Sequence, residues 1–536
     1  MKAAALKCLA TVLSVLFVSA CSVSSTLPPL AQAQSTTLFE LGAIQERTSL
    51  QALKQAPGIS PLLATLLDDP ATLSIQAVDV RPSTVSADAK SLVVQLAEHK
   101  TIQYQMRNAD SPAPGMIGWV GDVATDRRQR FNSSSEMDFD PFNWVSLVRE
   151  GDKVVGDLHV DGQLYRLDYI GNGRHVLIKV DESKLPPEAE PLAGLDSGKR
   201  DPTLGKRPQS AHSIIRVLLV SSIQTRARNP NYRMGLAQAL QNANLYMRNS
   251  RVAITYELAG FYDADYDETG RTYKQQLDDM RLAKPFGVEL LKVREALRAD
   301  LVSLYSSGSE YCGFAWINAS KIQGHSVISC LGSLAHEMGH NLGGEHNWHE
   351  GDTVGSPPYA YGYRYTSGSP RFSTQMSYGC SPACPRMPYH SNPDVTYQNI
   401  PVGSAEHHNA ARRFNERRET VENFYPPALN MKLIGSVRSC ELAHGLGSVS
   451  NIADECDIFA NREVVIIEIF NVPEGARLTF TEGGNKWRSY RAKTFIPQLL
   501  VTSLKGQPEH YPNMEIEEGS EPMTGRLSTI SSTMDR

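Results

Sequence analysis

The residues with the clearest chemical potential lie between His336 and His346, in the run His-Glu-Met-Gly-His-Asn-Leu-Gly-Gly-Glu-His. His336 and His340 are four residues apart, so on a helix both imidazoles lie on one face and can meet at one point. Gly343 and Gly344 favour the end of that helix, because glycine accepts a left-handed conformation. The chain can then turn and bring His346 to the same point. Three imidazoles are a donor set typical of one catalytic Zn²⁺, which keeps a fourth position for water.

Glu337, directly after the first of these histidines, has the properties of a general base. It lies about 100° further round the helix than His336, which is a poor position for a further ligand but within reach of a water on the ion. Zinc lowers the pKa of that water to about 7 and polarises a carbonyl, and a carboxylate can carry the proton to a leaving amine. The pattern therefore predicts attack of an activated water on a peptide carbonyl. The alternative is a non-catalytic zinc-binding surface lipoprotein with an adhesion or interaction role, although a structural zinc site needs no base.

The sequence around this run predicts alternating strands and helices, which indicates an α/β core. Apolar runs predict strands at 214–220, 252–258, 301–304, 313–317 and 326–329. Apolar residues at helical spacing predict helices at 234–247, 288–297 and 405–424. The last helix ends before Pro426 and Pro427, so the catalytic domain is expected to span 206–426.

Two further regions have β character. From about 70 to 182 apolar and polar residues alternate, with a hairpin expected over 154–167 around Asp161-Gly162. Residues 184–210 hold five prolines and two dibasic pairs, which predicts an exposed, protease-accessible linker. Strand patterns at 464–470 and 477–480 indicate a small C-terminal β domain over 427–536, and its sequence does not reveal its role.

The N-terminus has the form of a bacterial export signal. Lys2 and Lys7 precede the apolar run 9–18, which is too short to span a bilayer as a helix. Residues 1–20 end in Val-Ser-Ala before Cys21 and resemble a lipobox, so cleavage before Cys21 and a lipid on its thiol are expected. The alternative is ordinary cleavage after Ala33 with an unmodified cysteine. Residues 21–69 are then a polar tether and N-terminal segment that begins at the membrane of the cell envelope.

The remaining cysteines indicate an oxidising compartment. Cys8 leaves with the export signal, and besides Cys21 the chain holds Cys312, Cys330, Cys380, Cys384, Cys440 and Cys456. An even number in an exported chain implies disulfides, and six cysteines allow 15 connectivities. Nearest-neighbour pairing is the simplest, because each bond closes a short loop. A second metal site is the alternative, but Cys380 and Cys384 have no matching pair nearby.

The charge composition argues against nucleic acid as a partner. The 536 residues carry a net charge of −5 and contain no basic run, so nucleic acid is not an expected partner.

Four histidines lack ligand spacing and are interpreted as exposed polar residues: His325, His349, His407 and His408. An acidic group resembles part of a calcium loop without the glycine and distal glutamate of an EF-hand: Asp263, Asp265, Asp267 and Glu268. It is interpreted as an acidic surface loop, with Ca²⁺ as the alternative.

The eleven-residue run from His336 to His346 is the signature of the metzincin zinc endopeptidases, and the chain resembles that family. Its members have a Met-turn after the zinc motif, and the run 373–379, Ser-Thr-Gln-Met-Ser-Tyr-Gly, is similar to that turn. The resemblance implies that Met376 forms a hydrophobic floor beneath the zinc ligands. It also implies that Tyr378 turns toward the metal or the oxyanion, as a tyrosine does there in some metzincins. Plain core packing is the alternative for both side chains.

The similarity extends over about 70–426 and points to reprolysin-like bacterial peptidases of the peptidyl-Asp metalloendopeptidase type. Residues 312–330 resemble an upper-rim edge strand and its disulfide, 380–393 the wall of the primed-side pocket, 409–424 the closing helix and 117–187 a propeptide. The resemblance implies a mixed twisted sheet, an active-site helix, one Zn²⁺, and protein or peptide substrates. It also implies a latent exported precursor, with 70–205 as inhibitory propeptide and processing linker. Once cut, the catalytic domain is expected to leave its anchor for the medium.

Two residues depart from the reprolysin pattern. Asn347 stands where an aspartate normally follows the third histidine and bonds near the Met-turn. Gln375 stands where an apolar residue normally precedes the methionine. Neither is a metal ligand, but both bear on the subfamily and on any preference for aspartate at the cleavage site. Arg386, near the expected primed pocket, is a candidate for selecting acidic residues.

Overall fold

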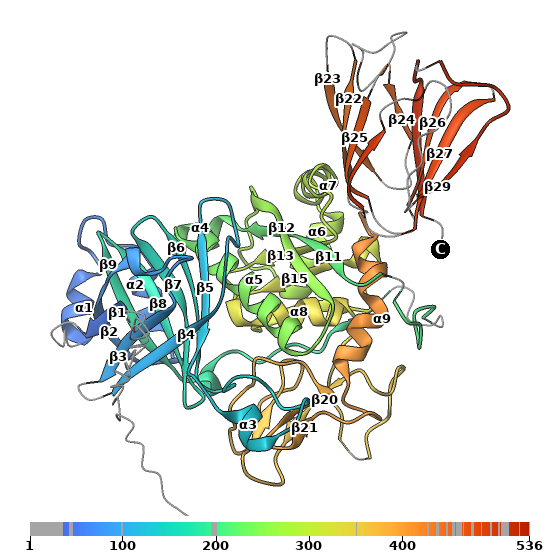
Figure 1. Ribbon diagram of the computed structural model, residues 1–536. Coiled ribbons are helices and arrows are strands. Elements are labelled where there is room, and N and C mark those ends of the chain that lie inside the picture. The colour runs from blue at the N-terminus through green and yellow to red at the C-terminus, as the bar shows by residue number, and fades with distance from the viewer. Residues whose placement is uncertain are drawn as a thin grey trace, which may run out of the picture. The chain divides into compact units, whose positions relative to one another are not determined.

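The computed structural model describes residues 36–41, 47–97, 100–194, 201–208, 210–349 and 351–425, followed by 428–435, 439–445, 449–452, 456, 464, 466–472, 476–483, 485–493, 496–501, 504, 514–524 and 526–534. The expected export signal, Cys21 and most of the expected tether lie outside these residues. All described residues belong to one unit, Ser35–Arg536 (Figure 1). Within the described part of the chain, no helix combines the length and the apolar character needed to cross a membrane.

The alternating N-terminal region folds into a closed β-barrel, drawn in blue and teal in Figure 1. Its strands follow the order β1-β2-β9-β8-β7-β6-β5-β4-β3. They are β1 (Thr36–Leu41), β2 (Thr72–Val80), β3 (Ser91–Ala97), β4 (Lys100–Asp110), β5 (Ile117–Asp122), β6 (Trp144–Glu150), β7 (Lys153–Val160), β8 (Gln163–Gly171) and β9 (Arg174–Val180). Closure leaves no free sheet edge, and alternate side chains such as Leu38, Trp119 and Leu147 form a buried cluster.

The barrel contains the expected hairpin but starts earlier than expected. β7 and β8 pair through Val160 and Gln163, and the turn residues Asp161 and Gly162 both have positive φ, 51° and 78°. Asp-Gly favours this tight turn because both of its positions need positive φ. β1 pairs antiparallel with β2 and parallel with β3, so part of the expected tether segment 21–69 is a barrel strand. Two unexpected short helices, α1 (Arg47–Leu53) and α2 (Leu62–Asp68), lie between β1 and β2 in sequence.

The central region forms a six-stranded sheet in the order β10-β14-β15-β13-β11-β12. The strands are β10 (Leu192–Ala193), β11 (Ser213–Ser221), β12 (Ile254–Asp263), β13 (Leu301–Tyr305), β14 (Gly313–Ile317) and β15 (His325–Ile328). β14 runs antiparallel to β15 and the other neighbours are parallel, so the sheet is mixed. Val217 and Leu219 join one hydrophobic cluster and Leu218 and Val220 another, which explains the continuous apolar run of β11.

Helices cover both faces of this sheet. They are α4 (Ile223–Arg228), α5 (Tyr232–Asn249), α6 (Tyr273–Leu282), α7 (Phe286–Ala296), α8 (Leu334–Asn341) and α9 (Ala410–Glu422), and α3 (Arg127–Phe131) lies earlier in the chain. α5, α8 and α9 pack on one face, and α6 and α7 on the other. α9 begins later than expected, because the Asn409 side chain accepts the Arg412 N–H (3.0 Å) and caps the helix there. α6 was not expected from its polar sequence, and a capping box between Thr272 and Gln275 begins it.

The stretch 184–210 is not the uniformly exposed linker that its prolines predict. β10 pairs in parallel with β14 through Leu192 and Ala193. Further upstream, Ala189 N–H donates to Gly313 O (3.2 Å). Without this segment the edge of β14 would expose unpaired backbone groups, and an added strand satisfies them. Residues 187–193, here called the pro-segment, therefore run along the edge of the central sheet.

Beyond α8 the chain forms three two-stranded sheets. They pair β16 (Glu345–Asn347) with β17 (Tyr361–Gly362), β18 (Arg364–Tyr365) with β19 (Phe372–Ser373), and β20 (Asn392–Tyr397) with β21 (Ile400–Val402). β16 carries His346 and Asn347, and β19 leads directly into the run that contains Met376. These short ladders position the loop residues of the expected site.

The C-terminal region consists of two antiparallel sheets, in agreement with a β domain. One has the order β23-β22-β25-β28 and the other β24-β30-β26-β27-β29. The strands are β22 (Ala428–Ile434), β23 (Ser439–Gly445), β24 (Val449–Asn451), β25 (Ile466–Val472), β26 (Ala476–Gly483), β27 (Lys486–Ala492), β28 (Ile496–Val501), β29 (Met514–Glu518) and β30 (Thr529–Met534). Leu433 and Ile467 from the first sheet and Phe480 from the second share one hydrophobic cluster, so the sheets pack face to face.

Three disulfides join Cys312 to Cys330, Cys380 to Cys384, and Cys440 to Cys456. This is the nearest-neighbour pairing, so these cysteines are not free to form a second metal site. The first bond links the start of β14 to the end of β15, and the second closes a short loop after the Met376 run. Both therefore restrain backbone next to the expected active site.

Candidate active site

Helix α8 and strand β16 bring the three motif histidines together. Every residue of α8 is buried, and Gly343, with φ of 88°, turns the chain after the helix. A Cβ at Gly343 would collide with the side chain of Asn318, so only glycine fits this turn. The Nε2 atoms of His336, His340 and His346 lie 3.0 to 3.1 Å from one another.

This donor set fits one tetrahedral zinc ion. Ligand nitrogens at about 2.0–2.1 Å from zinc would be separated by roughly 3.3 Å, which is close to the observed spacing. His336 Nδ1 donates to Gln375 O and His340 Nδ1 to Gly344 O, both at 2.7 Å. A carbonyl can only accept, so the proton sits on Nδ1 and the lone pair of Nε2 faces the common point. Burial lowers the pKa of both imidazoles well below its usual range, which keeps them neutral and able to bind a metal.

The two departures from the reprolysin pattern leave this geometry intact. The Asn347 side-chain oxygen accepts the Tyr378 N–H (3.1 Å), so an amide makes the link to the Met376 run. Gln375 supplies its backbone carbonyl to His336, and its side-chain amide donates to Met387 O (2.7 Å). Both side chains therefore tie the run 373–379 to its neighbours, which restrains the histidine ring that the run supports.

Met376 packs against helix α8. Its side chain is fully buried, and a Cβ at Gly339 would collide with its sulfur atom. Gly339 stands between His336 and His340 in sequence, so the thioether packs against the helix at the level of the two imidazoles. Met338 and Phe414 belong to the same hydrophobic cluster.

Glu337 is completely buried beside a second carboxylate. Ligand atoms of Glu337, Glu188 and His336 all lie within 4.8 Å of one another. Burial raises the pKa of Glu337 well above its usual range, and the neighbouring Glu188 raises it further. A Cβ at Gly313 would collide with the Glu337 carboxyl group, so β14 approaches this close only because it begins with glycine.

The pro-segment supplies Glu188 and a second acidic residue to the site. Glu188 Oε1 accepts the Ser333 hydroxyl at the start of α8 (2.6 Å). Glu190 accepts the hydroxyl of Tyr378, and its other oxygen lies 3.4 Å from His346 Nδ1. The Tyr378 and His346 rings are adjacent, with centroids 4.1 Å apart. Sequence reasoning missed both glutamates, because nothing in a proline-rich stretch signals that it adds to a distant strand.

The remaining candidate ligands are engaged elsewhere. His325 is buried on β15, which corrects its interpretation as exposed, and His349 contacts Asn347 and Arg364. His407 stacks on Trp348, and His408 contacts Ser404. In the acidic group, Asp263 pairs with Arg233, Asp267 accepts the Thr269 N–H and Glu268 accepts the Ser307 N–H. Within the described ranges, metal-binding side chains gather in threes only at the histidine triad and around Glu188, His336 and Glu337.

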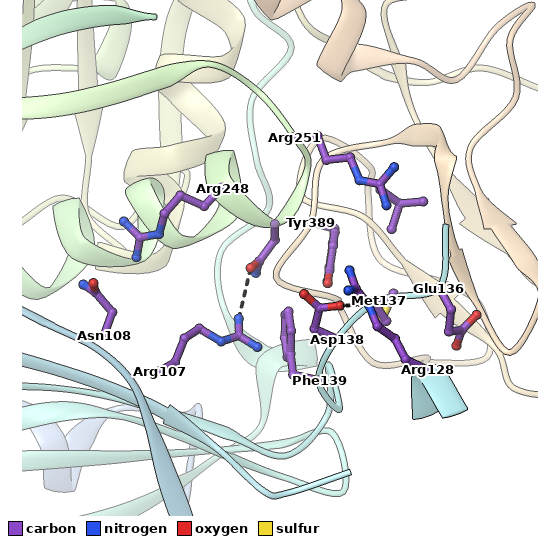
Figure 2. A pocket seen from close by; sticks show the side chains of 12 residues that line it. Arg107, Asn108, Arg128, Glu136, Met137, Asp138, Phe139, Arg248, Arg251 and Tyr389 are labelled. Carbon is purple, nitrogen blue, oxygen red and sulfur yellow. Dashed lines mark hydrogen bonds and ion pairs between the residues drawn. The ribbon is translucent and has the colours of Figure 1, made fainter. Parts of the chain in front are cut away.

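A separate cavity of about 430 Å³ lies between the barrel and the central domain (Figure 2). Its lining includes Arg107, Arg128, Arg248 and Arg251, with Phe139 and Tyr389. Arg107 bonds Asp122 and Asn249, Arg128 pairs with Asp138, and Arg251 donates to two backbone carbonyls. These contacts join barrel residues to the end of α5 and its surroundings. The cavity is therefore part of a polar seam and includes none of the three motif histidines.

Comparisons with known proteins agree with this geometry. A family model described as metallo-peptidase family M12B, reprolysin-like, matches residues 235–347. A peptidyl-Asp metalloendopeptidase of Stenotrophomonas maltophilia (strain R551-3) is 30% identical over 408 residues, covering 74% of this chain and 95% of the relative. One of Xanthomonas campestris pv. campestris is 30% identical over 397 residues, covering 72% and 92%. With this likeness over most of both chains, the protein belongs to the reprolysin-like bacterial peptidyl-Asp metalloendopeptidase family and is a zinc-dependent endopeptidase.

Proposed function

We propose that His336, His340 and His346 hold the zinc ion of this endopeptidase and that Glu337 is its general base. The observation that carries the assignment is the convergence of three Nε2 atoms at 3.0–3.1 Å beside a buried carboxyl group. When bound, zinc polarises the scissile carbonyl and lowers the pKa of the attacking water to about 7. Glu337 takes the proton of that water and passes it to the leaving amine. Exchange of Glu337 for glutamine tests this role by separating metal binding from turnover.

Neighbouring residues support the reaction without taking part in proton transfer. Met376 packs against Gly339 and restrains the ligand helix from below. The Tyr378 ring packs against the His346 ring, and its hydroxyl is free to face the oxyanion once Glu190 has left. A non-catalytic zinc lipoprotein is not supported, because the chain's relatives are peptidases and its glutamate is in place.

We further propose that the pro-segment keeps the precursor latent. Glu188 lies beside Glu337, and Glu190 contacts both His346 and Tyr378, so two carboxylates stand where the substrate and water would react. The backbone of the same segment extends the sheet along β14. Between Cys21 and Cys312 the chain has no cysteine, so a thiolate cannot be the blocking group. Latency therefore depends on carboxylates and on backbone pairing.

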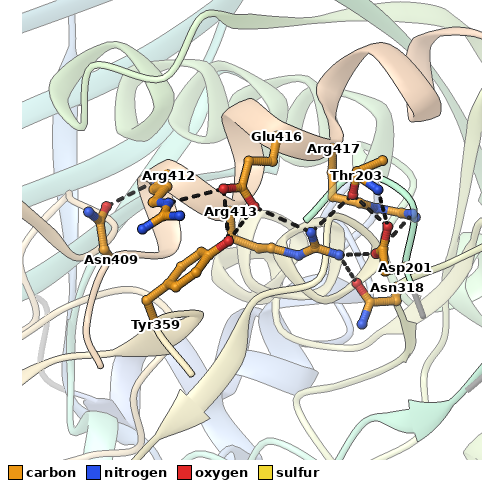
Figure 3. A network of polar contacts seen from close by, with 9 residues as sticks. All are labelled: Asp201, Thr203, Asn318, Tyr359, Asn409, Arg412, Arg413, Glu416 and Arg417. Atoms are coloured by element: carbon orange, nitrogen blue, oxygen red, sulfur yellow. Dashed lines mark hydrogen bonds and ion pairs between the residues drawn. The ribbon is translucent and has the colours of Figure 1, made fainter. Parts of the chain in front are cut away.

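Asp201 and Thr203 contact helix α9 of the catalytic domain (Figure 3). Asp201 pairs with Arg413 on α9, and Thr203 accepts from the same guanidinium (3.1 Å). The Arg413 side chain is fully buried, and Asn318 also accepts its N–H. Removing Asp201 would leave a buried cation short of a counter-charge. We therefore infer that processing cuts before Asp201, upstream of the domain start expected at 206, and the dibasic pair at 199–200 lies outside the described residues.

Acid is expected to weaken this contact. Burial raises the pKa of Asp201, but Thr203, Arg413 and Arg417 outweigh burial and lower it to about 2. A carboxyl group whose pKa is lowered by folding stabilises the fold at pH values above its ordinary pKa of about 4. This stabilisation is lost as the pH falls toward 2. We expect Asp201→Asn to lower the free energy of unfolding of the processed protein by about 2 kcal/mol at neutral pH. Urea unfolding should show this difference shrinking as the pH falls below 4.

A matched exchange at another carboxylate provides the control for the acid effect. Asp278 pairs with Lys274 one helical turn away on α6, so Asp278→Asn in the processed protein should change stability little at any pH. If the stability difference for Asp201→Asn were the same at neutral pH and near pH 3, the Asp201–Arg413 contact would not be the cause.

We propose that the precursor is exported and anchored by lipid on Cys21. Three disulfides agree with an oxidising compartment outside the cytoplasm. Because the anchor would precede the barrel, cutting before Asp201 would detach the catalytic domain from the lipid, provided that the barrel also separates. The barrel contacts α5 through polar pairs, Asp157 with Gln238 (2.7 Å) and with Asn242 (3.0 Å), so separation has to break these bonds.

Metabolic labelling with an alkyne fatty acid tests the anchor. The expected result is a labelled full-length band in membranes and an unlabelled band in the medium. The unlabelled band should be near 37 kDa, the share of 59.0 kDa that residues 201–536 represent. Cys21→Ser should abolish the label and move the precursor out of the membrane fraction. A labelled band of mature size, or a wild-type precursor without label, would contradict the proposal.

Protein or peptide substrates with an acidic residue near the cleaved bond are the proposed substrate class. The relatives carry the name peptidyl-Asp metalloendopeptidase, which describes their own preference. In this chain carboxylates of the pro-segment lie at the site, which supports a preference for acidic side chains.

A further inference from the structure

Arg386 is a half-buried cation in the chain segment beside the Met376 run. Ser373 N–H donates to Pro385 O (3.0 Å), which places the Arg386 backbone against this run. The guanidinium donates through Nη2 to Ser377 O (3.3 Å), one residue past Met376. It forms no ion pair with any carboxylate among the described residues. A cation that is partly removed from water and unpaired is costly, so this position favours a bound anion.

The pro-segment places a carboxylate under the influence of that cation. Glu188 Oε1 accepts the Ser333 hydroxyl (2.6 Å), while Oε2 is buried without a hydrogen-bond partner in the described structure. Burial raises the pKa of Glu188, and the charge of Arg386 is the strongest influence that lowers it. Since Glu188 also adjoins His336 and Glu337, its carboxylate lies next to the reacting groups.

We propose that Arg386 determines specificity by binding an acidic side chain of the substrate next to the cleaved bond, and that Glu188 occupies this place in the precursor. The inference rests on the proposed release of the pro-segment. Release removes Glu188, which takes a nearby negative charge away from the guanidinium and leaves the Ser333 hydroxyl without its acceptor. A substrate carboxylate supplies Arg386 with the ion pair that it lacks, and the planar guanidinium binds a carboxylate through two parallel bonds. An amide of the same shape carries no charge and satisfies Arg386 less well.

Matched peptides and an exchange of Arg386 test this role. Internally quenched peptides that differ only by aspartate or asparagine, placed in turn on each side of the cleaved bond, are given to the processed full-chain product. We expect wild type to prefer the aspartate peptide at one position. Arg386→Gln should reduce the ratio of kcat/KM for the aspartate over the asparagine peptide by about 10- to 100-fold, as loss of a charged hydrogen bond implies. Arg386→Lys should recover part of the ratio, because it keeps the charge but not the planar fork.

Two controls distinguish loss of specificity from loss of structure. Arg371→Gln removes another guanidinium near the same loop, where it donates to Pro382 O (2.8 Å), and should leave the ratio unchanged. Cleavage of the asparagine peptide by Arg386→Gln within a few-fold of the wild-type rate shows that the site is still assembled. If wild type prefers aspartate and Arg386→Gln keeps that preference, Arg386 is not the determinant. If wild type cleaves no peptide at all, the proposed function fails and the inference falls with it.

Discussion

Exchange of Glu337 for glutamine is expected to lower kcat of the processed enzyme by about 10²- to 10⁴-fold, the usual contribution of a general base. The amide has nearly the same shape as the carboxyl group, so the contact with Gly313 is preserved. It cannot take a proton from water, so the step that forms the nucleophile slows. The three imidazoles are untouched, and zinc content measured by mass spectrometry should remain one ion per chain.

A neutral exchange elsewhere provides the control for Glu337. Glu289 lies on α7 and pairs with Lys292 at the surface, so Glu289→Gln should leave both zinc content and kcat unchanged. Full activity of Glu337→Gln would show that another group is the base. Loss of zinc together with activity would instead indicate that this carboxyl group supports the metal.

The uncut precursor is expected to be about 10³-fold less active than the processed enzyme. A tethered segment acts at an effective concentration on the order of mM, so even a micromolar intrinsic affinity keeps the site blocked. Comparison of kcat/KM before and after cleavage of the 184–210 stretch measures the effect. N-terminal sequencing of the active product should find a start before Asp201.

Two further results identify the blocking group. The double exchange Glu188→Gln and Glu190→Gln in the uncut precursor should raise its residual activity about tenfold, since charge-assisted contacts are lost. Glu150→Gln on the barrel, where Glu150 pairs with Lys153, is the matched control and should not raise it. A mercurial alone should not activate the precursor, because the described cysteines are in disulfides. Activation by the mercurial would indicate that a cysteine thiolate blocks the site.

The parts of the site that follow from the sequence depend on short-range geometry. His336 and His340 meet because four residues make about one helical turn, and glycine at 343 permits the turn that brings His346 back. The same holds for the Asp161-Gly162 hairpin and for β11, whose apolar residues predict a strand buried on both faces. In each case the information lies within one element, where periodicity and turn chemistry determine the conformation.

Other features required the tertiary structure because their partners are far apart in sequence. α6 is polar, and its helix depends on a local cap together with buried contacts of Tyr273 and Leu277 on the sheet. β1 has too few residues to be distinguished from a tether until it closes the barrel between β2 and β3. His325 reads as a polar surface residue, but its strand is enclosed on both sides.

The pro-segment shows most clearly what the sequence by itself determined and what the fold decided. The zinc motif, its glutamate and the catalytic chemistry were readable from residue types and spacing. Prolines 186, 187 and 191 predicted exposed chain, and the dibasic pairs predicted access for a protease. The structure places Glu188 and Glu190 at the zinc site instead, because the edge of β14 needs backbone partners and the buried histidines and Tyr378 offer contacts to carboxylates. Neither the pro-segment nor β14 carries a sequence signal for this pairing, because the unpaired edge of β14 exists only once the sheet has formed.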